Sequence, residues 1–239
     1  HTYFASVDCV GFGSRVLSAV GSGSTTNNAY TNLKTTIKTI NASPFASLGY
    51  VATAYQFAVG FPVLTAANST HWQYISGNVS AADVNTYNHQ LSNTVGNYTG
   101  VRKGGFANCT SGDVLAFGYG PTSSSNGHFM VMESAPQLLD ANGLHMYYPN
   151  QSIATLQTFL NTNKMYAVNV IDDSGQNAHA FDSRTNTSGI GHGTVLIATA
   201  TNDDAPTGYV FKPSNSVNVH WINTKIGEHT SELQSPCNL

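Results

Sequence analysis

The sequence predicts one α+β domain, in which helices come first and a mainly antiparallel sheet follows. Residues 29–100 show mostly helical apolar spacing, whereas from about residue 112 the apolar runs are short and separated by turn residues. Helices followed by strands are the α+β pattern. No repeat, linker or shift in charge marks a boundary, so residues 1–239 are predicted to form a single domain.

The first expected element is a helix over residues 8–21. Apolar side chains recur at positions 9, 12, 16 and 20, which is helical spacing. Asp8 suits the N-cap, and Gly21 suits the position after the helix end. Cys9 is therefore predicted in the first helical turn, on the buried side.

Further helices are expected near residues 30–40, 45–58 and 81–92, with breaks at Pro44, at Pro62 and around residues 68–70. The second half predicts strands instead. Their apolar runs are Val114–Phe117, Phe129–Met132, Tyr166–Ile171, Val195–Ala200, Tyr209–Phe211 and Val217–Ile222.

Composition excludes several classes of protein. Charged residues make up only 9% of the chain, against roughly 25% in an average soluble protein. A net charge of −3 without a basic cluster argues against a nucleic-acid partner. No apolar run approaches the length of about 18 residues that a membrane span needs. With 41% hydrophobic residues, the chain is not disordered.

Several features favour an extracellular protein. Seven Asn-x-Ser/Thr sequons occur, and they are compatible with glycosylation in a eukaryotic secretory route. The sequons begin at Asn41, Asn68, Asn78, Asn97, Asn108, Asn150 and Asn186. The chain opens at His1 without a basic and apolar leader, so we expect a processed, secreted form.

The chain has three cysteines, an odd number that leaves one thiol over in an oxidising compartment. A disulfide between Cys109 and Cys237 would tie the C-terminal tail to the body and leave Cys9 free. A free cysteine is often a small buried hydrophobic residue. At a helix N-terminus, however, unsatisfied backbone N–H groups favour the thiolate and lower the pKa of the thiol.

A nucleophilic thiol needs a base and a third group that orients the base. His128 is the candidate base because it opens a predicted strand after a turn at residues 123–127. Asp172, with Asp173 as the reserve, follows the run Tyr166–Ile171 and could hydrogen-bond His128. The alternatives are a structural His128 and a pair of aspartates that cap a turn.

Three motifs then resemble the NlpC/P60 superfamily of papain-like cysteine hydrolases, which mostly cut bacterial cell-wall peptides. Asp8-Cys9-x-Gly11-Phe12 resembles its nucleophile motif, Ser111-Gly112-Asp113-Val114 its Gly-Asp strand entry, and Gly127-His128-Phe129-Met130-Val131 its catalytic-histidine strand. Later segments resemble a less characterised branch: Val170-Ile171-Asp172, His179-Ala180-Phe181-Asp182-Ser183-Arg184, Gly189-Ile190-Gly191-His192-Gly193-Thr194 and Gly208-Tyr209-Val210-Phe211. The motifs occur in the family's order and span Cys9 to Phe211.

The resemblance implies a papain-like fold with N-terminal helices packed on the sheet. It also implies Cys9 as nucleophile and His128 as base, with Asp172 carried over from the branch. His179 and His192 are expected to line a substrate pocket. The alternative for both is a structural role in core or turn hydrogen bonding.

The chain departs from the family pattern at Val10, where serine usually follows the nucleophile, and at Ser111, where proline is usual. The long gap between Cys9 and His128 predicts a helical insertion at about residues 25–105. Arg184 is expected to pair with Asp182, with a substrate carboxylate as the other candidate partner.

The predicted function is a secreted, monomeric cysteine hydrolase that cleaves an amide or peptide bond by acyl transfer. Its expected partner is a peptide or peptidoglycan-like substrate, with no nucleic acid, membrane, metal or other cofactor. Two alternatives stay open. One is a catalytically inactive binding module on the same fold. The other is a copper enzyme that chelates the metal through the amine and imidazole of His1.

Overall fold

The computed structural model describes residues 12–13, 16, 105–117, 127–202 and 204–221. Residues 12, 13 and 16 are helical, as the prediction of a helix over residues 8–21 requires. The helices expected near residues 30–40, 45–58 and 81–92 lie outside the described ranges. So do His1, Cys9, Cys237 and nearly all of the predicted insertion.

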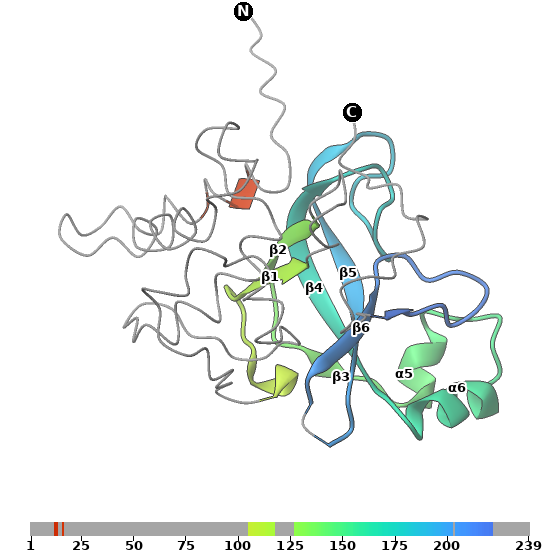
Figure 1. The fold of residues 1–239 in the computed structure, drawn as a ribbon. Helices are drawn as coiled ribbons and strands as arrows, with labels where there is room; N and C mark the ends of the chain where they lie inside the picture. The colour runs from red at the N-terminus through yellow and green to blue at the C-terminus, as the bar shows by residue number, and fades with distance from the viewer. Residues whose placement is uncertain (1–11, 14–15, 17–104, 118–126, 203, 222–239) are drawn as a thin grey trace, which may run out of the picture.

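Within the described residues, seven strands form one antiparallel sheet in the order β1-β2-β4-β5-β6-β7, with β3 also paired to β4 (Figure 1). The strands are β1 Val114–Phe117, β2 His128–Met132, β3 Gln137–Leu138, β4 Lys164–Ser174, β5 Gly189–Thr199, β6 Pro206–Val210 and β7 His220–Trp221. The prediction of a mixed α+β architecture with an antiparallel sheet is confirmed.

The longest strands extend beyond their predicted apolar runs. β4 and β5 pair over eleven residues each, from Lys164 opposite Thr199 to Ser174 opposite Gly189. The added ends carry aspartate, serine, glycine and histidine, which an apolar pattern does not register. The last predicted strand, Val217–Ile222, is wrong in extent, because only His220–Trp221 pairs with β6 among the described residues.

Two short helices were not expected. α5 spans Ala141–His145 and α6 spans Ile153–Leu160. Both begin at capping residues, since the Asp140 carboxylate accepts from the Gly143 N–H and the Ser152 hydroxyl accepts from the Thr155 N–H. These caps satisfy backbone donors that have no partner inside the helix.

The sheet buries a different core on each face. α5 and α6 lie together against one face, called here the helix face (Figure 1). Its buried residues are Leu139, Ala141, Leu144, Tyr148, Leu156, Met165, Ala167, Leu196, Ala198 and Val210. The opposite face, called here the Met130 face, buries Phe106, Cys109, Phe117, Met130, Met132, Tyr166, Val168, Val170, Val195, Ile197 and Tyr209.

The Asp204 carboxylate fastens the segment around η3 (Phe106–Asn108) to the sheet. It accepts hydrogen bonds from the Ala107 N–H at 2.9 Å, the Tyr166 hydroxyl at 2.8 Å and the Thr199 hydroxyl at 2.9 Å. Burial opposes ionisation, but these donors outweigh it and hold the pKa of Asp204 below its usual range. Asp204 therefore links η3 to both β4 and β5.

The structure does not support the expected disulfide. Cys109 is a buried free thiol that packs in the core of the Met130 face. Burial, with the nearby charges of Asp113 and Asp204, raises the pKa of this thiol to about 12. Cys109 therefore stays protonated near neutral pH and does not act as a thiolate nucleophile.

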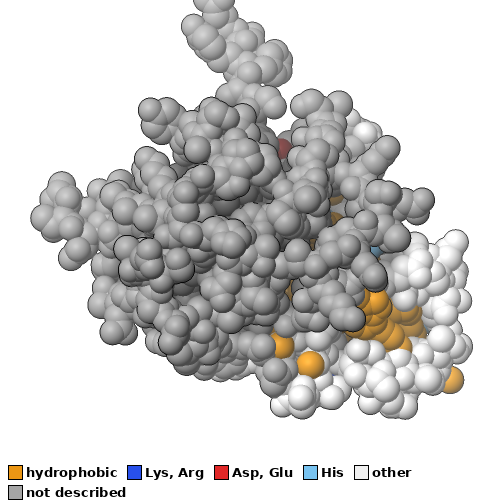
Figure 2. All heavy atoms as spheres, viewed as in Figure 1, with side chains coloured by type: hydrophobic (Ala, Val, Ile, Leu, Met, Phe, Trp, Pro, Cys, Tyr) orange, Lys and Arg blue, Asp and Glu red, His pale blue; other side chains and the backbone are white. Residues whose placement is uncertain are grey.

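Within the described ranges, every helix is too short or too polar to cross a lipid bilayer. Apolar side chains also reach the surface beside α5 (Figure 2). The exposed large hydrophobic residues are Leu138, Met146, Ile153, Phe181, Ile190 and Trp221.

Candidate active site

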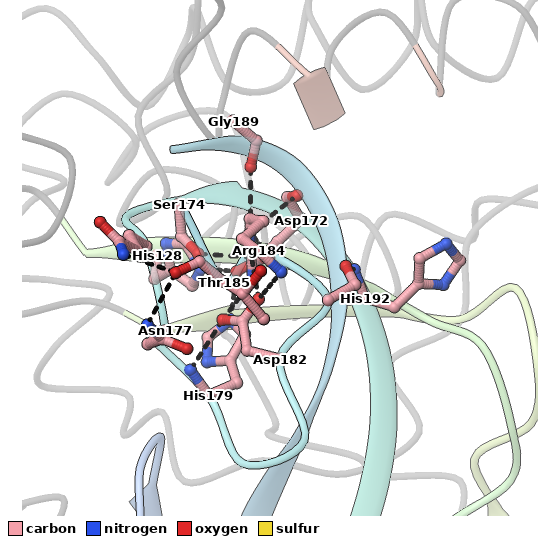
Figure 3. A network of polar contacts seen from close by, with 12 residues as sticks. His128, Asp172, Ser174, Asn177, His179, Asp182, Arg184, Thr185, Gly189 and His192 are labelled. Atoms are coloured by element: carbon pink, nitrogen blue, oxygen red, sulfur yellow. Dashed lines mark hydrogen bonds and ion pairs between the residues drawn. The ribbon is translucent and has the colours of Figure 1, made fainter. Parts of the chain in front are cut away.

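A fully buried carboxylate, Asp172, lies at the centre of a polar cluster on the Met130 face (Figure 3). Its Oδ2 accepts hydrogen bonds from Nε2 of His128 and, at 2.6 Å, from Nε2 of His179. Its Oδ1 accepts one from Nη1 of Arg184 at 2.7 Å. Two imidazoles and one guanidinium therefore converge on a single carboxylate.

The pairing of β2 with β4 brings His128 and Asp172 together. The register sets Val131 opposite Ile171 and Met132 opposite Val170. Because side chains alternate between faces, His128 lies on the same face of β2 as Met130 and Met132. Asp172 follows Val168 and Val170 on the same face of β4. The apolar rows that form the core thus end in the imidazole and the carboxylate.

The same alternation separates Asp172 from Asp173. Asp172 lies inside β4, two residues before the strand ends, so the expectation of an aspartate after the strand end is corrected. Its buried neighbours on the same face are Val170 and Ser174, whereas Asp173 is half-buried and points to the other face. Of the two candidate carboxylates, Asp172 is the one that contacts His128.

Two glycines of β5 make room for the cluster. A Cβ atom added at Gly193 would lie 2.5 Å from Cβ of His179, and one added at Gly191 would lie 2.6 Å from Cγ of Arg184. Real Cβ atoms do not approach other atoms so closely. The alternating glycines of the Gly191-x-Gly193 segment therefore let the two side chains lie directly on the sheet.

The segment from His179 to Arg184 is held by a second carboxylate, Asp182. This side chain accepts from the backbone N–H groups of His179 at 3.0 Å and Arg184 at 2.8 Å. It also pairs with the Arg184 guanidinium, through Nε at 2.8 Å and Nη2 at 3.1 Å. The expected Arg184–Asp182 pair is therefore present, and it fixes the loop that carries His179.

The charges in the cluster stabilise one another. Burial opposes ionisation of Asp172, but hydrogen bonds from His128 and His179 outweigh it and hold its pKa well below the usual range. The pKa of Asp182 is lowered in the same way by Arg184, and the pKa of Arg184 is raised by the two carboxylates. Both carboxylates are thus ionised, and Arg184 is cationic, at neutral pH.

The two imidazoles are packed against a common aromatic ring. The ring centroid of Phe211 lies 5.4 Å from that of His128 and 5.5 Å from that of His179. Both imidazoles are almost fully buried. Within the described part of the chain, Nδ1 of His179 is buried without a hydrogen-bond partner. Phe211 is therefore an apolar neighbour that the two imidazoles share.

His128, Asp172 and His179 also form a group that could hold a metal ion, with one ligand atom from each within 4.8 Å of the others. Two imidazoles and a carboxylate suit zinc. A metal ligated at Nε2 of His179 would, however, require a proton on Nδ1, which has no acceptor among the described residues. The guanidinium of Arg184 adds positive charge to the same carboxylate. The contacts fit a hydrogen-bonded cluster better than a metal centre.

The expected site residues are brought together only in part. His128, Asp172 and His179 are in one cluster. His192 points away from it (Figure 3), with a side chain that is 58% exposed and bonded through Nδ1 to Glu133 at 2.8 Å. The predicted nucleophile Cys9 lies outside the described residues.

The attachment of Arg184 to Asp172 was not expected from the sequence. Arg184 was predicted to pair with Asp182, two residues away, and its second carboxylate comes from a different strand. The nearest signal in the sequence was the Gly191-x-Gly193 spacing, which marks where large side chains lie against the backbone.

No protein-family model matches this chain, and neither does any curated protein or solved structure.

Proposed function

We propose that this protein is a cysteine hydrolase that cleaves an amide or peptide bond, with Cys9 as nucleophile, His128 as base and Asp172 as the group that orients the base. The supporting observation is the buried hydrogen bond between Nε2 of His128 and Oδ2 of Asp172. In a nucleophile–base–acid triad a carboxylate orients the base, and this hydrogen bond supports that role for Asp172.

The proposed mechanism assigns one task to each group. Because Asp172 is ionised and accepts at Oδ2, His128 carries its proton on Nε2 and receives the thiol proton at Nδ1. The thiolate of Cys9 attacks the substrate carbonyl, and backbone N–H groups at the start of the predicted helix stabilise the oxyanion. His128 protonates the leaving amine, and water then hydrolyses the thioester.

A contact near the N-terminus is compatible with this assignment. A Cβ atom added at helical Gly13 would lie 2.3 Å from the ring of Phe129, so Gly13 packs directly on the residue after His128. Cys9 precedes Gly13 by four residues, and four residues of chain span at most about 14 Å. A reach of this size is compatible with the proposed pairing of Cys9 with His128.

The substrate class and the location belong to the same proposal. The resemblance of the motifs to NlpC/P60 hydrolases points to cell-wall peptide as the substrate, and to a papain-like arrangement of helix and sheet. Asn108, Asn150 and Asn186, the sequon asparagines within the described residues, are all exposed, as glycosylation of a secreted protein requires.

The test is digestion of purified peptidoglycan, with new peptide ends identified by mass spectrometry. We expect Cys9→Ala and His128→Ala to lower the rate at least about 1,000-fold, the scale of loss for triad members that act as a unit. Cys109→Ala is the matched control and keeps its activity, because Cys109 is a buried, protonated thiol. A Cys9→Ala protein with full activity would overturn the proposal.

Two further measurements separate the alternatives. Activity that is lost in EDTA and restored by zinc would favour a metal centre at His128, Asp172 and His179. Iodoacetamide labelling at pH 6 needs no substrate. It reports a reactive thiolate, because a thiolate is alkylated faster than a thiol. Labelling of Cys9 no faster in the folded chain than in a urea-denatured control would favour an inactive binding module.

A further inference from the structure

We infer that His179 is a positioning residue of the proposed reaction. It shares the Asp172 carboxylate with His128 and so limits how strongly Asp172 stabilises the His128 imidazolium. This inference rests on the proposed function. It assigns His179 a role inside the cluster, in place of the substrate contact that the sequence suggested.

The first step is the protonation state of His179. An ionised carboxylate offers only acceptors, so the Nε2 atom that lies 2.6 Å from Oδ2 carries a proton. Nδ1 of the same ring is buried and has no partner among the described residues. A second proton there would be a buried donor without an acceptor, which is costly. His179 is therefore a neutral imidazole with its proton on Nε2.

The second step is the charge of the cluster. Two carboxylates, Asp172 and Asp182, face one guanidinium, Arg184, which leaves one net negative charge. One added proton neutralises the cluster. His179 lacks an acceptor for it, so the proton goes to His128. The residues that face the Asp172 carboxylate from the described elements are His128 of β2, Ser174 of β4, and His179 and Arg184 of the loop.

The third step is competition for one oxygen atom. His128 and His179 both donate to Oδ2, whereas Arg184 donates to Oδ1. Each donor withdraws negative charge from the carboxylate and makes it a weaker partner for the others. With His179 in place, His128 therefore gives up its proton more readily than it would beside an uncontested carboxylate. Without His179, Asp172 would hold the imidazolium more tightly.

The position of His179 is specified by its surroundings. Its ring lies on Gly193, its backbone N–H is held by Asp182, and its face contacts Phe211. The imidazole therefore has no room to turn towards a substrate without losing these contacts. This placement fits a group that acts through Asp172.

The experiment is an NMR titration of the His128 ring protons in the full chain, together with the pH profile of kcat/KM on peptidoglycan. His179→Phe keeps an aromatic ring next to Phe211 but removes the donor. We expect the midpoint of the His128 titration to rise by roughly 0.5–1 pH unit, because loss of a hydrogen bond to the carboxylate strengthens its hold on the imidazolium. The limb of the pH profile that follows His128 moves by the same amount.

Two matched variants control the result. His179→Gln restores an N–H donor near the same point, and we expect it to bring the midpoint back towards the wild-type value. His192→Gln removes an exposed imidazole on the other face and is expected to leave the titration unchanged. A midpoint that stays at the wild-type value in His179→Phe would overturn the inference, and so would equal shifts in the Phe and Gln variants.

A measurement on the unaltered protein covers the case in which His179→Phe does not fold. The ¹⁵N shifts of the His179 ring report its tautomer directly. A protonated Nε2 and an unprotonated Nδ1 are expected, and a proton on Nδ1 would overturn the inference. These titrations do not need enzymatic activity. Their outcome is therefore independent of the loss of activity in Cys9→Ala that tests the proposed function.

Discussion

On the helix face of the sheet, fully buried leucines such as Leu144, Leu156 and Leu196 pack against one another. On the Met130 face the apolar core ends in a carboxylate, two imidazoles and a guanidinium, which are almost as completely buried. Both faces belong to the same strands, and β4 and β5 contribute to each. The two faces differ in how burial of their side chains contributes to the free energy of folding.

Removing apolar surface from water stabilises a fold by about 25 cal/mol per Å². Removing charges from water costs free energy, and a buried ion pair regains it only when every group is well paired. The polar cluster is well paired, but apolar side chains of similar size could fill its place at least as stably. Stability alone therefore does not account for the cluster, and the two faces are expected to respond differently to substitution.

The largest effect is expected at the centre of the cluster. Asp172→Ala should lower the free energy of unfolding by roughly 3–5 kcal/mol, because it leaves Arg184 and two imidazoles buried without their shared partner. Urea unfolding at pH 7 measures this loss. The control is Glu133→Gln, which breaks the exposed pair with His192 and should cost less than about 1 kcal/mol.

The pH dependence of this difference has a definite sign. The pKa of Asp172 is lower in the folded protein than in the unfolded chain, so its contribution is complete above about pH 4 and is lost as the pH falls. The gap in stability between the original protein and Asp172→Ala should narrow from pH 5 to pH 2. A gap that is constant or widens over this range would mean that Asp172 is not held as an ion in the folded state.

A substitution on the helix face should separate stability from activity. Leu156→Ala removes a fully buried side chain of α6 and should cost about 3 kcal/mol through the cavity that it leaves. Hydrolysis of peptidoglycan at temperatures where the variant stays folded should change less than about twofold, because Leu156 lies on the face opposite Asp172. Leu138→Ala, at a 57% exposed position of β3, is the control, with a loss of stability below about 0.5 kcal/mol.

Much of the sheet could be predicted from the sequence, because it depends on local apolar patterns. The run Val114–Phe117 coincides with β1, and the expected strand start at His128 coincides with the first residue of β2. The patterns failed at the strand ends that carry the candidate site. The ends of β4 and β5 are polar or glycine-rich, since they hold Asp172 and make room for His179 and Arg184.

The helices α5 and α6 were missed for a different reason. α5 is only five residues long and contains Gly143, and glycine weakens helices in isolation. α6 has a recognisable signal, in which the Ser152 cap precedes apolar residues at positions 153, 156 and 160, but its eight residues fall between two predicted strands. In both cases packing against the sheet supplies stability that local sequence does not.

The candidate site was predictable as a list of residues but not as a network. His128 and Asp172 were selected by their places at strand ends and by motif order, and the structure brings them into contact. His192 was selected with His179 because both stand in segments that resemble the same branch of the NlpC/P60 superfamily. Strand alternation places the Cβ of His192 on the other side of β5 from the glycine positions that receive His179. Such a distinction requires the register of the sheet, which composition and spacing do not give.

The smallest effect is expected at the glycines beneath the cluster, and it tests the packing that holds His179. Gly193→Ala should destabilise the protein by about 1–3 kcal/mol, because the new methyl group would overlap Cβ of His179. Gly143→Ala in α5 is the matched control. A Cβ atom added at Gly143 would lie 3.2 Å from its nearest neighbour, the flexible end of the Leu139 side chain. The change should raise the stability of the protein by up to about 1 kcal/mol through helix propensity.

The same pair of variants distinguishes the two faces by their chemistry. Gly193→Ala moves His179 away from β5 and should therefore shift the His128 titration in the direction expected for His179→Phe, by a smaller amount. Gly143→Ala should leave that titration unchanged, since α5 lies on the helix face. If Gly193→Ala were as well tolerated as Gly143→Ala, His179 would not be pressed against the strand. The contact with Gly193 would then not be what fixes His179 beside the Asp172 carboxylate.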